Sequence, residues 1–120
     1  MDIQIRFMKE LHLNLKKEFY NLIESGVKKE EYREIKPYWI KRLCYQRLEH
    51  QDCFPGYKCE ECIRNEYLAY PFDAVVFRYG YTKRFMVWSI DEISIGQGRT
   101  DWGAPENKET FIIKLKERLA

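Results

Sequence analysis

The sequence predicts a small α+β domain whose strands curl into a barrel, with two or three helices packed outside it. Three observations support this fold class. Apolar residues alternate with polar ones over 11–15, and two longer segments rich in β-branched and aromatic residues follow at 74–81 and 85–95. Two segments in the first half carry apolar residues at helical spacing. The 120 residues, 45% of them hydrophobic, suffice for one core, so we expect a single domain over 1–120.

The N-terminal third predicts a strand followed by a helix. The leucines of residues 11–15 alternate with polar side chains, which fits a half-buried strand. Asn14 suits the N-cap of the next segment, where an apolar stripe runs from Phe19 to Ile23. Gly26 is well placed to end this helix in the left-handed conformation.

Residues 28–35 have the length of a strand but carry charged side chains on both faces, which a purely structural strand does not require. Glu31 and Arg33 lie two positions apart, so both side chains leave the same face of such a strand. Pro37 then fits the first turn of a second helix with one apolar side.

The C-terminal half predicts an antiparallel pair of strands over 74–81 and 85–95, joined by a short turn. A turn-rich loop over 96–107 and a closing strand over 111–115 follow. Regular patterning fails over 45–70, and three of the four cysteines lie there. We interpret this segment as an inserted loop.

The charge of the chain does not by itself define a partner. The 21 basic and 19 acidic residues leave a formal charge of +2, so a nucleic-acid partner is neither required nor excluded. Residues 28–47 are locally basic and rich in aromatic side chains. No apolar run approaches the roughly 20 residues that span a bilayer, and the N-terminus lacks the pattern of a signal peptide. We therefore expect a cytoplasmic protein without a membrane partner.

Residues 26–33 read Gly-Val-Lys-Lys-Glu-Glu-Tyr-Arg and match the pattern G-x-K-x-x-E-x-R. This pattern resembles the signature of the ASCH family, whose fold is similar to the PUA barrel. Further segments resemble bacterial and phage members in their order and spacing: Tyr38-Trp39, Phe77 to Tyr81, Ile95-Gly96 with Gly98, and Trp102 to Pro105. The resemblance covers nearly the whole chain outside 45–70, and it implies a PUA-like barrel with a cleft lined by the motif.

For the family, the resemblance implies recognition of RNA or of a modified nucleoside or nucleotide in this cleft. Arginine suits a phosphate or a developing negative charge, and an aromatic ring at the rim can stack on a base. The ligand-binding residues predicted on these grounds are Gly26, Lys28, Glu31, Arg33, Arg78 and Trp102.

Three alternatives stay open. The charged residues of the motif can form an exposed ion-pair ladder without a ligand. The protein can be a small hydrolase, an amidohydrolase on a modified nucleobase or a ribonuclease, with Lys28 and Glu31 in proton transfer. Nucleoside-deacylating members of the family carry a threonine at the position of Glu31, so this chain departs from their pattern. The third alternative is a protein-interaction domain that uses the cysteine-containing insert, with a partner that the sequence does not name.

The cysteines allow a structural zinc site. Cys53, Cys59 and Cys62 lie within a short span, and Cys44 or His50 can supply a fourth ligand. A loop without its own hydrophobic core gains folding free energy from such a metal. Reduced thiols without metal are the other alternative, because the expected compartment disfavours disulfides. No other cofactor is indicated.

Overall fold

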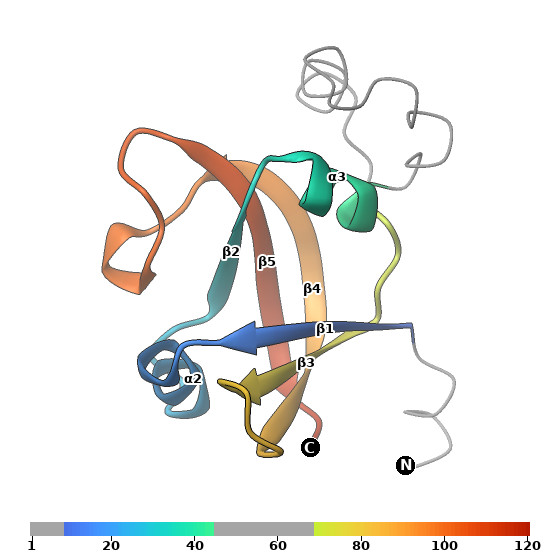
Figure 1. The fold of residues 1–120 in the computed structure, drawn as a ribbon, viewed down its shortest axis with the longest axis vertical. Helices are drawn as coiled ribbons and strands as arrows, with labels where there is room; N and C mark the ends of the chain where they lie inside the picture. Colours follow the sequence, from blue (N-terminus) through green and yellow to red (C-terminus); the bar gives the residue numbers. More distant parts are fainter. Residues whose placement is uncertain (1–8, 45–68) are drawn as a thin grey trace. The chain divides into compact units, whose positions relative to one another are not determined.

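The computed structural model describes residues 9–44 and 69–120. Within them it contains five strands, two α-helices and one 3-10 helix (Figure 1). Their bounds are β1 (Glu10–Leu15), α2 (Lys17–Glu24), β2 (Glu30–Glu34), α3 (Pro37–Leu43), β3 (Ala74–Tyr79), β4 (Phe85–Gln97), η2 (Thr100–Trp102) and β5 (Glu109–Arg118).

The five strands form one sheet in the order β1-β3-β4-β5-β2. β1 pairs with β3 in parallel, with Leu13 opposite Phe77, and the two strands lie side by side in Figure 1. β3 pairs with β4 in antiparallel orientation, with Val76 opposite Val87. The predicted α+β class is therefore confirmed, as is the antiparallel pair. Closure of the strands into a barrel stays a prediction.

The described chain divides into two compact units, each assembled from segments far apart in sequence. The first unit contains residues 9–30, 71–92 and 114–120. The second contains residues 31–44, 69–70 and 93–113. The long strands β4 and β5 contribute residues to both units, whereas β1 and β3 belong wholly to the first.

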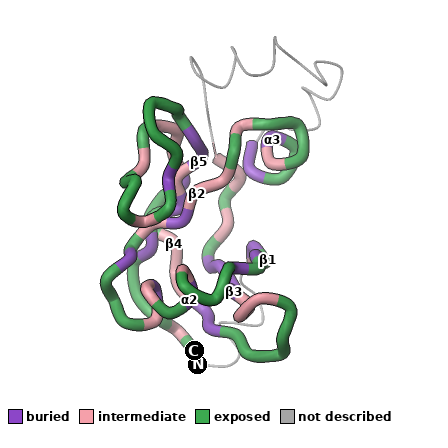
Figure 2. Tube along the Cα trace, turned by 60° about the vertical axis from the view of Figure 1, so that its left-hand side comes forward, coloured by how far each residue is buried: buried purple, intermediate pink, exposed green. Residues whose placement is uncertain are grey.

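The core of the first unit is built on β1, α2 and β3. The three leucines of β1 are buried and alternate with exposed residues, as predicted. Ala74 to Phe77 of β3 are all buried, which is typical of a strand covered on both faces (Figure 2). α2 adds the buried side chains of Tyr20 and Ile23. Apolar burial from these three elements supplies the main driving force for folding this unit.

The ends of α2 are defined by different means. Asn14 lies inside β1, opposite Arg78 of β3, so the predicted cap was wrong: strand pairing extends one residue further and Lys16 becomes the N-cap. Gly26 adopts φ +85°, which confirms the predicted left-handed end of the helix. Beyond it, the backbone N–H of Lys28 donates to the carbonyl of Leu22 at 3.0 Å.

In the second unit, α3 begins at Pro37, in the first-turn position that the sequence predicts. Ile40 and Leu43 of this helix are buried, as are Phe111 and Ile113 of β5. The backbone N–H of Tyr70 donates to the carbonyl of Leu43 at 2.9 Å. Neither α-helix in the described part of the chain has the length and apolar character that crossing a bilayer requires.

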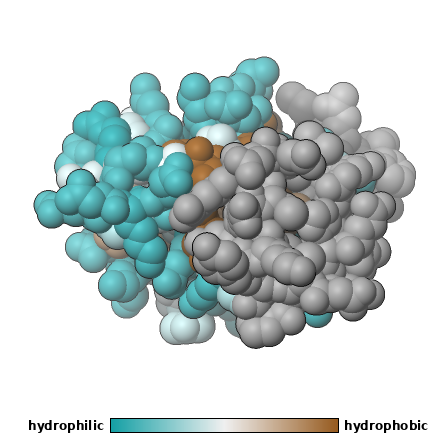
Figure 3. Space-filling view, turned by 90° about the horizontal axis from the view of Figure 1, so that it is seen from above, coloured by the Kyte–Doolittle hydropathy of each residue, from teal (hydrophilic) through white to brown (hydrophobic). Residues whose placement is uncertain are grey.

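Among the described residues that Figure 3 shows from above, most are hydrophilic, and apolar residues are few. Large contiguous apolar patches usually mark sites of association with proteins or membranes.

Tyr20 provides a test of the packing in the first unit. Its ring is fully buried, but its hydroxyl has no hydrogen-bond partner among the described residues. We expect Tyr20→Phe to raise the free energy of unfolding by about 1 kcal/mol, because a buried unsatisfied hydroxyl is removed. Tyr20→Ala should lower it by about 3–5 kcal/mol through the cavity it leaves. Urea unfolding measures both, with the exposed Tyr81→Phe as control, and a destabilised Tyr20→Phe would contradict this packing.

Candidate functional site

Two motif residues, Gly26 and Lys28, lie in the first unit. Lys28 is only 1% exposed, although lysine is rarely buried to this extent. The turn at Gly26 places the backbone of Lys28 against the end of α2, and the Lys28 side chain folds back over that helix. The Nζ atom lies 4.5 Å from the centre of the Phe19 ring, a cation–π geometry. Lys28 is therefore held firmly, away from bulk solvent.

Glu31 and Arg33 are the motif residues on β2, in the second unit. The Nη2 atom of Arg33 lies 2.7 Å from Oε2 of Glu31, and the two side chains are 19% and 8% exposed, in that order. The guanidinium also stacks 5.0 Å from the centre of the Trp39 ring on α3. The prediction that Glu31 and Arg33 share one face of a strand is confirmed, and the pair is largely withdrawn from water.

Tyr32 and Glu34, at the alternate positions of β2, contact a different set of residues. The Tyr32 hydroxyl accepts a hydrogen bond from the backbone N–H of Arg99 at 3.1 Å. The Lys108 ammonium donates to Glu34 at 3.1 Å and holds the pKa of that exposed carboxyl below its usual value. One face of β2 thus carries the ion pair, and the other anchors the segment between β4 and β5.

Gly98 allows that anchoring because of its close approach to Tyr32. A Cβ atom at this position would lie 2.5 Å from Cε1 of Tyr32 and 2.7 Å from Cβ of Ala104. Only a residue without a side chain fits there. The sequence identified Gly98 as part of a turn-rich loop, but a glycine required by a ring on the distant strand β2 leaves no local signal.

Trp102 lies on η2 in the second unit and is half-buried. The guanidinium of Arg99 covers its ring at 3.9 Å and also pairs with Asp101 at 2.7 Å. This hydrogen-bonded pairing lowers the pKa of the Asp101 carboxyl. The sequence predicted that the Trp102 ring stacks on a base. It did not identify Arg99, whose guanidinium covers one face of that ring.

A shallow depression lies on the surface beside this tryptophan-containing turn. It is formed by one continuous segment, from the end of β4 through η2 and the following loop, with a mixture of amide, acidic and basic side chains. Its lining residues are Gln97, Gly98, Arg99, Thr100, Asp101, Glu106 and Asn107. Gln97 braces the loop, because its side-chain nitrogen donates to the carbonyl of Pro105 at 2.8 Å.

Arg78 lies near the end of β3 in the first unit, half-buried, with its guanidinium 6.0 Å from the centre of the Phe85 ring. The predicted ligand-binding residues are therefore distributed over both units. Gly26, Lys28 and Arg78 belong to the first, and Glu31, Arg33 and Trp102 to the second. Glu31 and Arg33 are brought into direct contact.

Of the predicted metal ligands, Cys44 alone lies among the described residues. It is buried at the end of α3 and forms an isolated bridge with Ala69. Cys53, Cys59 and Cys62 lie outside the described residues, as does His50 and nearly all of the predicted insert. Within residues 9–44 and 69–120, no three His, Cys, Asp or Glu side chains are grouped so that they could hold a metal. Zinc binding stays a prediction.

Comparison of the chain with protein-family models, with curated proteins and with solved structures finds no match. Membership of the ASCH family therefore stays a prediction that rests on the motif and on the order of the accompanying segments.

The close approach at Gly98 predicts a strong dependence on residue size. We expect Gly98→Ala to lower the free energy of unfolding by about 1–3 kcal/mol, because the added methyl group must displace Tyr32 or Ala104. Gly96→Ala is the matched control, since its new methyl would meet Ile112 at an ordinary 3.5 Å. Thermal and urea unfolding compare the two, and equal stabilities would refute the close approach.

The burial of the Glu31–Arg33 pair predicts a non-additive response. Arg33→Ala should lower the free energy of unfolding by about 3 kcal/mol, because it leaves a buried carboxylate without this partner. The double variant E31L/R33M should lie within about 1 kcal/mol of the wild type, since an apolar pair avoids the desolvation cost. Urea unfolding of both singles and the double gives the coupling energy. A double variant less stable than either single would show that the pair is a net source of stability.

Proposed function

We propose that this chain is an ASCH-type module that recognises RNA or a modified nucleotide through Lys28, Glu31 and Arg33. The observation that carries the proposal is the Glu31–Arg33 pair on one face of β2, in which Glu31 is buried and the Arg33 guanidinium lies over the Trp39 ring. A planar guanidinium offers several donors at fixed angles to phosphate or carbonyl oxygens, and a carboxylate accepts from the amino groups of a base. Together they match the mixed donor and acceptor edge of a nucleobase.

Energetics support a functional reason for keeping this pair. Moving two charges out of water costs several kcal/mol each, and an apolar pair of similar volume usually stabilises a protein as well or better. The side-chain exposures of 19% and 8% place Arg33 and Glu31 in this costly range. The exposed ion-pair ladder, the alternative without a ligand, does not account for this burial.

The position of Lys28 in the chain supports its assignment to the same ligand. Three peptide units separate it from Glu31, which keeps the two Cα atoms within about 11 Å in any conformation. A cation kept from water interacts more strongly with a phosphate or carbonyl than an exposed one does. Lys28 would thus contribute a second positive charge to recognition of the same ligand.

The finer fold assignment belongs to the same proposal. The described strand order, with two helices beside a five-stranded sheet, is compatible with closure into a small PUA-like barrel of the ASCH type. We assign the protein to the cytoplasm, where RNA and nucleotides are available to it.

A hydrolase acting on a modified nucleobase or on RNA is the second candidate, and the burial of Lys28 favours it. A lysine amine held in a site with little water can act as a base or nucleophile. Glu31 would then take part in proton transfer. Turnover of a modified nucleoside that disappears in Glu31→Gln, while binding persists, would favour the enzyme over the binding module.

A binding screen tests the proposed function. Isothermal titration with a panel of modified nucleosides and with short RNA oligonucleotides identifies a ligand for the wild type. We then expect Lys28→Ala and Arg33→Ala each to weaken its binding at least 10-fold, since each removes a charge-assisted contact worth about 1.5–3 kcal/mol.

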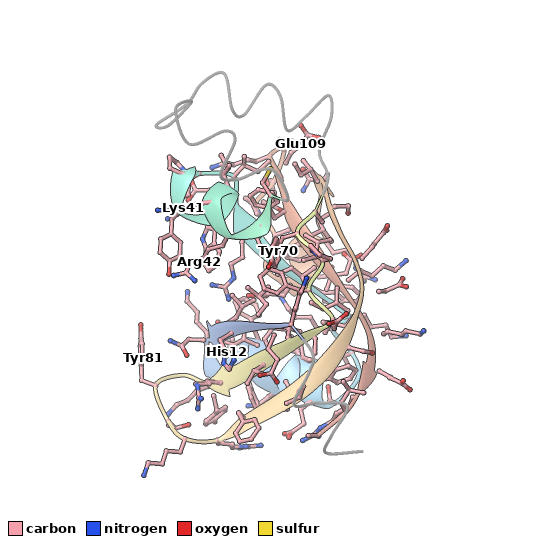
Figure 4. All side chains as sticks on the ribbon, turned by 90° about the vertical axis from the view of Figure 1, so that its right-hand side faces the viewer. His12, Lys41, Arg42, Tyr70, Tyr81 and Glu109 are labelled. Carbon is pink, nitrogen blue, oxygen red and sulfur yellow. The ribbon has the colours of Figure 1, made fainter. Side chains whose placement is uncertain are left out.

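Lys41→Ala is the matched control, because Lys41 is an exposed lysine of α3 outside the motif (Figure 4). Circular dichroism confirms that each variant is folded. Equal affinities of the motif variants and the control would refute the proposal.

A further inference from the structure

A group of basic residues lies at one end of the first unit, away from the motif in sequence. Lys16 and Lys17 directly follow β1, Arg78 lies one residue before the end of β3, and Lys83 lies in the turn between β3 and β4. Leu15 pairs with Tyr79, and the two parallel strands end together in Figure 1. We call Lys16, Lys17, Arg78 and Lys83 the basic hairpin end.

The packing of this region brings the two chain segments into contact. The backbone N–H of Gly80 donates to the carbonyl of Leu15 at 2.9 Å. A Cβ atom at Gly80 would lie 3.9 Å from Cε of Lys17, so the lysine side chain passes over the turn. The Nζ atom of Lys17 lies 5.3 Å from the centre of the Tyr79 ring.

The positive charge of the basic hairpin end is not neutralised by the described part of the protein. None of its four cations forms an ion pair with a carboxylate of the described residues. The guanidiniums of Arg84 and Arg118, by contrast, both pair with Glu24, at 2.7 and 3.6 Å. Glu18, in the first turn of α2, is the acidic residue next to Lys17 in sequence. In a chain of net charge +2, this local excess of cations that are unpaired within the described residues makes the region positive.

An aromatic side chain projects from the same turn. Tyr81 is 97% exposed and points away from the protein at the tip of the hairpin (Figure 4). Phe85 is half exposed beside the guanidinium of Arg78. A ring that buries almost no surface contributes nothing to the core, so the exposure of Tyr81 has no explanation in stability.

We propose that the basic hairpin end binds single-stranded nucleic acid, with its cations on the phosphates and the Tyr81 ring stacked on a base. Single-strand binders combine these two features, a positive surface along the backbone and exposed aromatic rings for the bases. The inference rests on the proposed recognition of RNA or a nucleotide and names single-stranded nucleic acid as the class of ligand. An anionic membrane is a poorer match, because interfacial binding uses a broad apolar face and this end offers one tyrosine and a half-covered phenylalanine.

Fluorescence anisotropy with a short fluorescein-labelled oligouridine tests this surface. The variant K16Q/K83Q removes two exposed cations that pair with no carboxylate of the described residues, and K114Q/K116Q is the control with the same change in charge on β5. The plot of log affinity against log salt should lose about 1.4 in slope for K16Q/K83Q, because each lost phosphate contact on a single strand accounts for about 0.7. The control should lose less than half of that.

Tyr81→Ala provides an independent measurement. Loss of one stacking contact should weaken oligouridine binding roughly 5- to 100-fold with the salt slope unchanged. Both residues altered in K16Q/K83Q, and Tyr81, are exposed, so these variants should unfold at the wild-type urea concentration. Absence of oligouridine binding to the wild type would overturn the inference, as would variants that bind like the control.

Two further arms separate the possible explanations. Sedimentation with mixed phosphatidylcholine and phosphatidylserine vesicles, phosphatidylcholine in excess, tests the membrane alternative. Vesicle binding that K16Q/K83Q abolishes, with oligouridine binding unaffected, would overturn the nucleic-acid assignment. Arg33→Ala, measured with the same oligouridine, tests the motif. Loss of affinity in the hairpin variants alone would support the basic hairpin end and count against RNA binding by the motif. Loss in Arg33→Ala alone would support the motif and overturn the inference.

Discussion

The two-residue period of β2 is the constraint on which the candidate site depends. A strand sends successive side chains to opposite faces, and every residue of this one is polar or charged. Glu31 and Arg33 therefore meet on one face as a shielded ion pair, while Tyr32 and Glu34 bind the β4–β5 segment from the other. A shift of one residue in this strand would exchange the two sets and disrupt both groups of contacts.

A second constraint is the reversal of the chain at Gly26. Its left-handed conformation ends α2, and the next backbone bonds fix Lys28 against the helix that precedes it. The buried ammonium and the charged strand thus follow from a local backbone event with a simple cause, the absence of a Cβ atom. The motif spacing reflects this geometry: glycine for the turn, lysine at the helix end, and then two charges one strand repeat apart.

The elements predicted correctly from sequence are those whose cause is local. The alternating leucines of β1, the left-handed glycine after α2 and the proline at the start of α3 each act within a few residues. The shared face of Glu31 and Arg33 follows equally from the period of a strand.

The features that sequence reasoning missed depend on partners far along the chain. Asn14 belongs to β1 rather than to a helix cap because its strand pairs with β3, in the other half of the sequence. The fit of Gly98 against the Tyr32 ring and the cover that Arg99 gives to Trp102 require three-dimensional packing. No periodicity within one segment reports on such contacts.

Glu24 divides the basic side chains of the first unit into two groups. Its single carboxylate receives the guanidiniums of Arg84 and Arg118, so these two cations are committed to the protein itself. Lys16 and Lys83 have no such acceptor among the described residues and face the solvent. This chain has nearly equal numbers of acidic and basic residues. The positions of a few carboxylates therefore decide which part of the surface keeps a net positive charge and can attract a polyanion. The pattern of neutralisation, more than the number of cations, therefore shapes the electrostatic face of this protein.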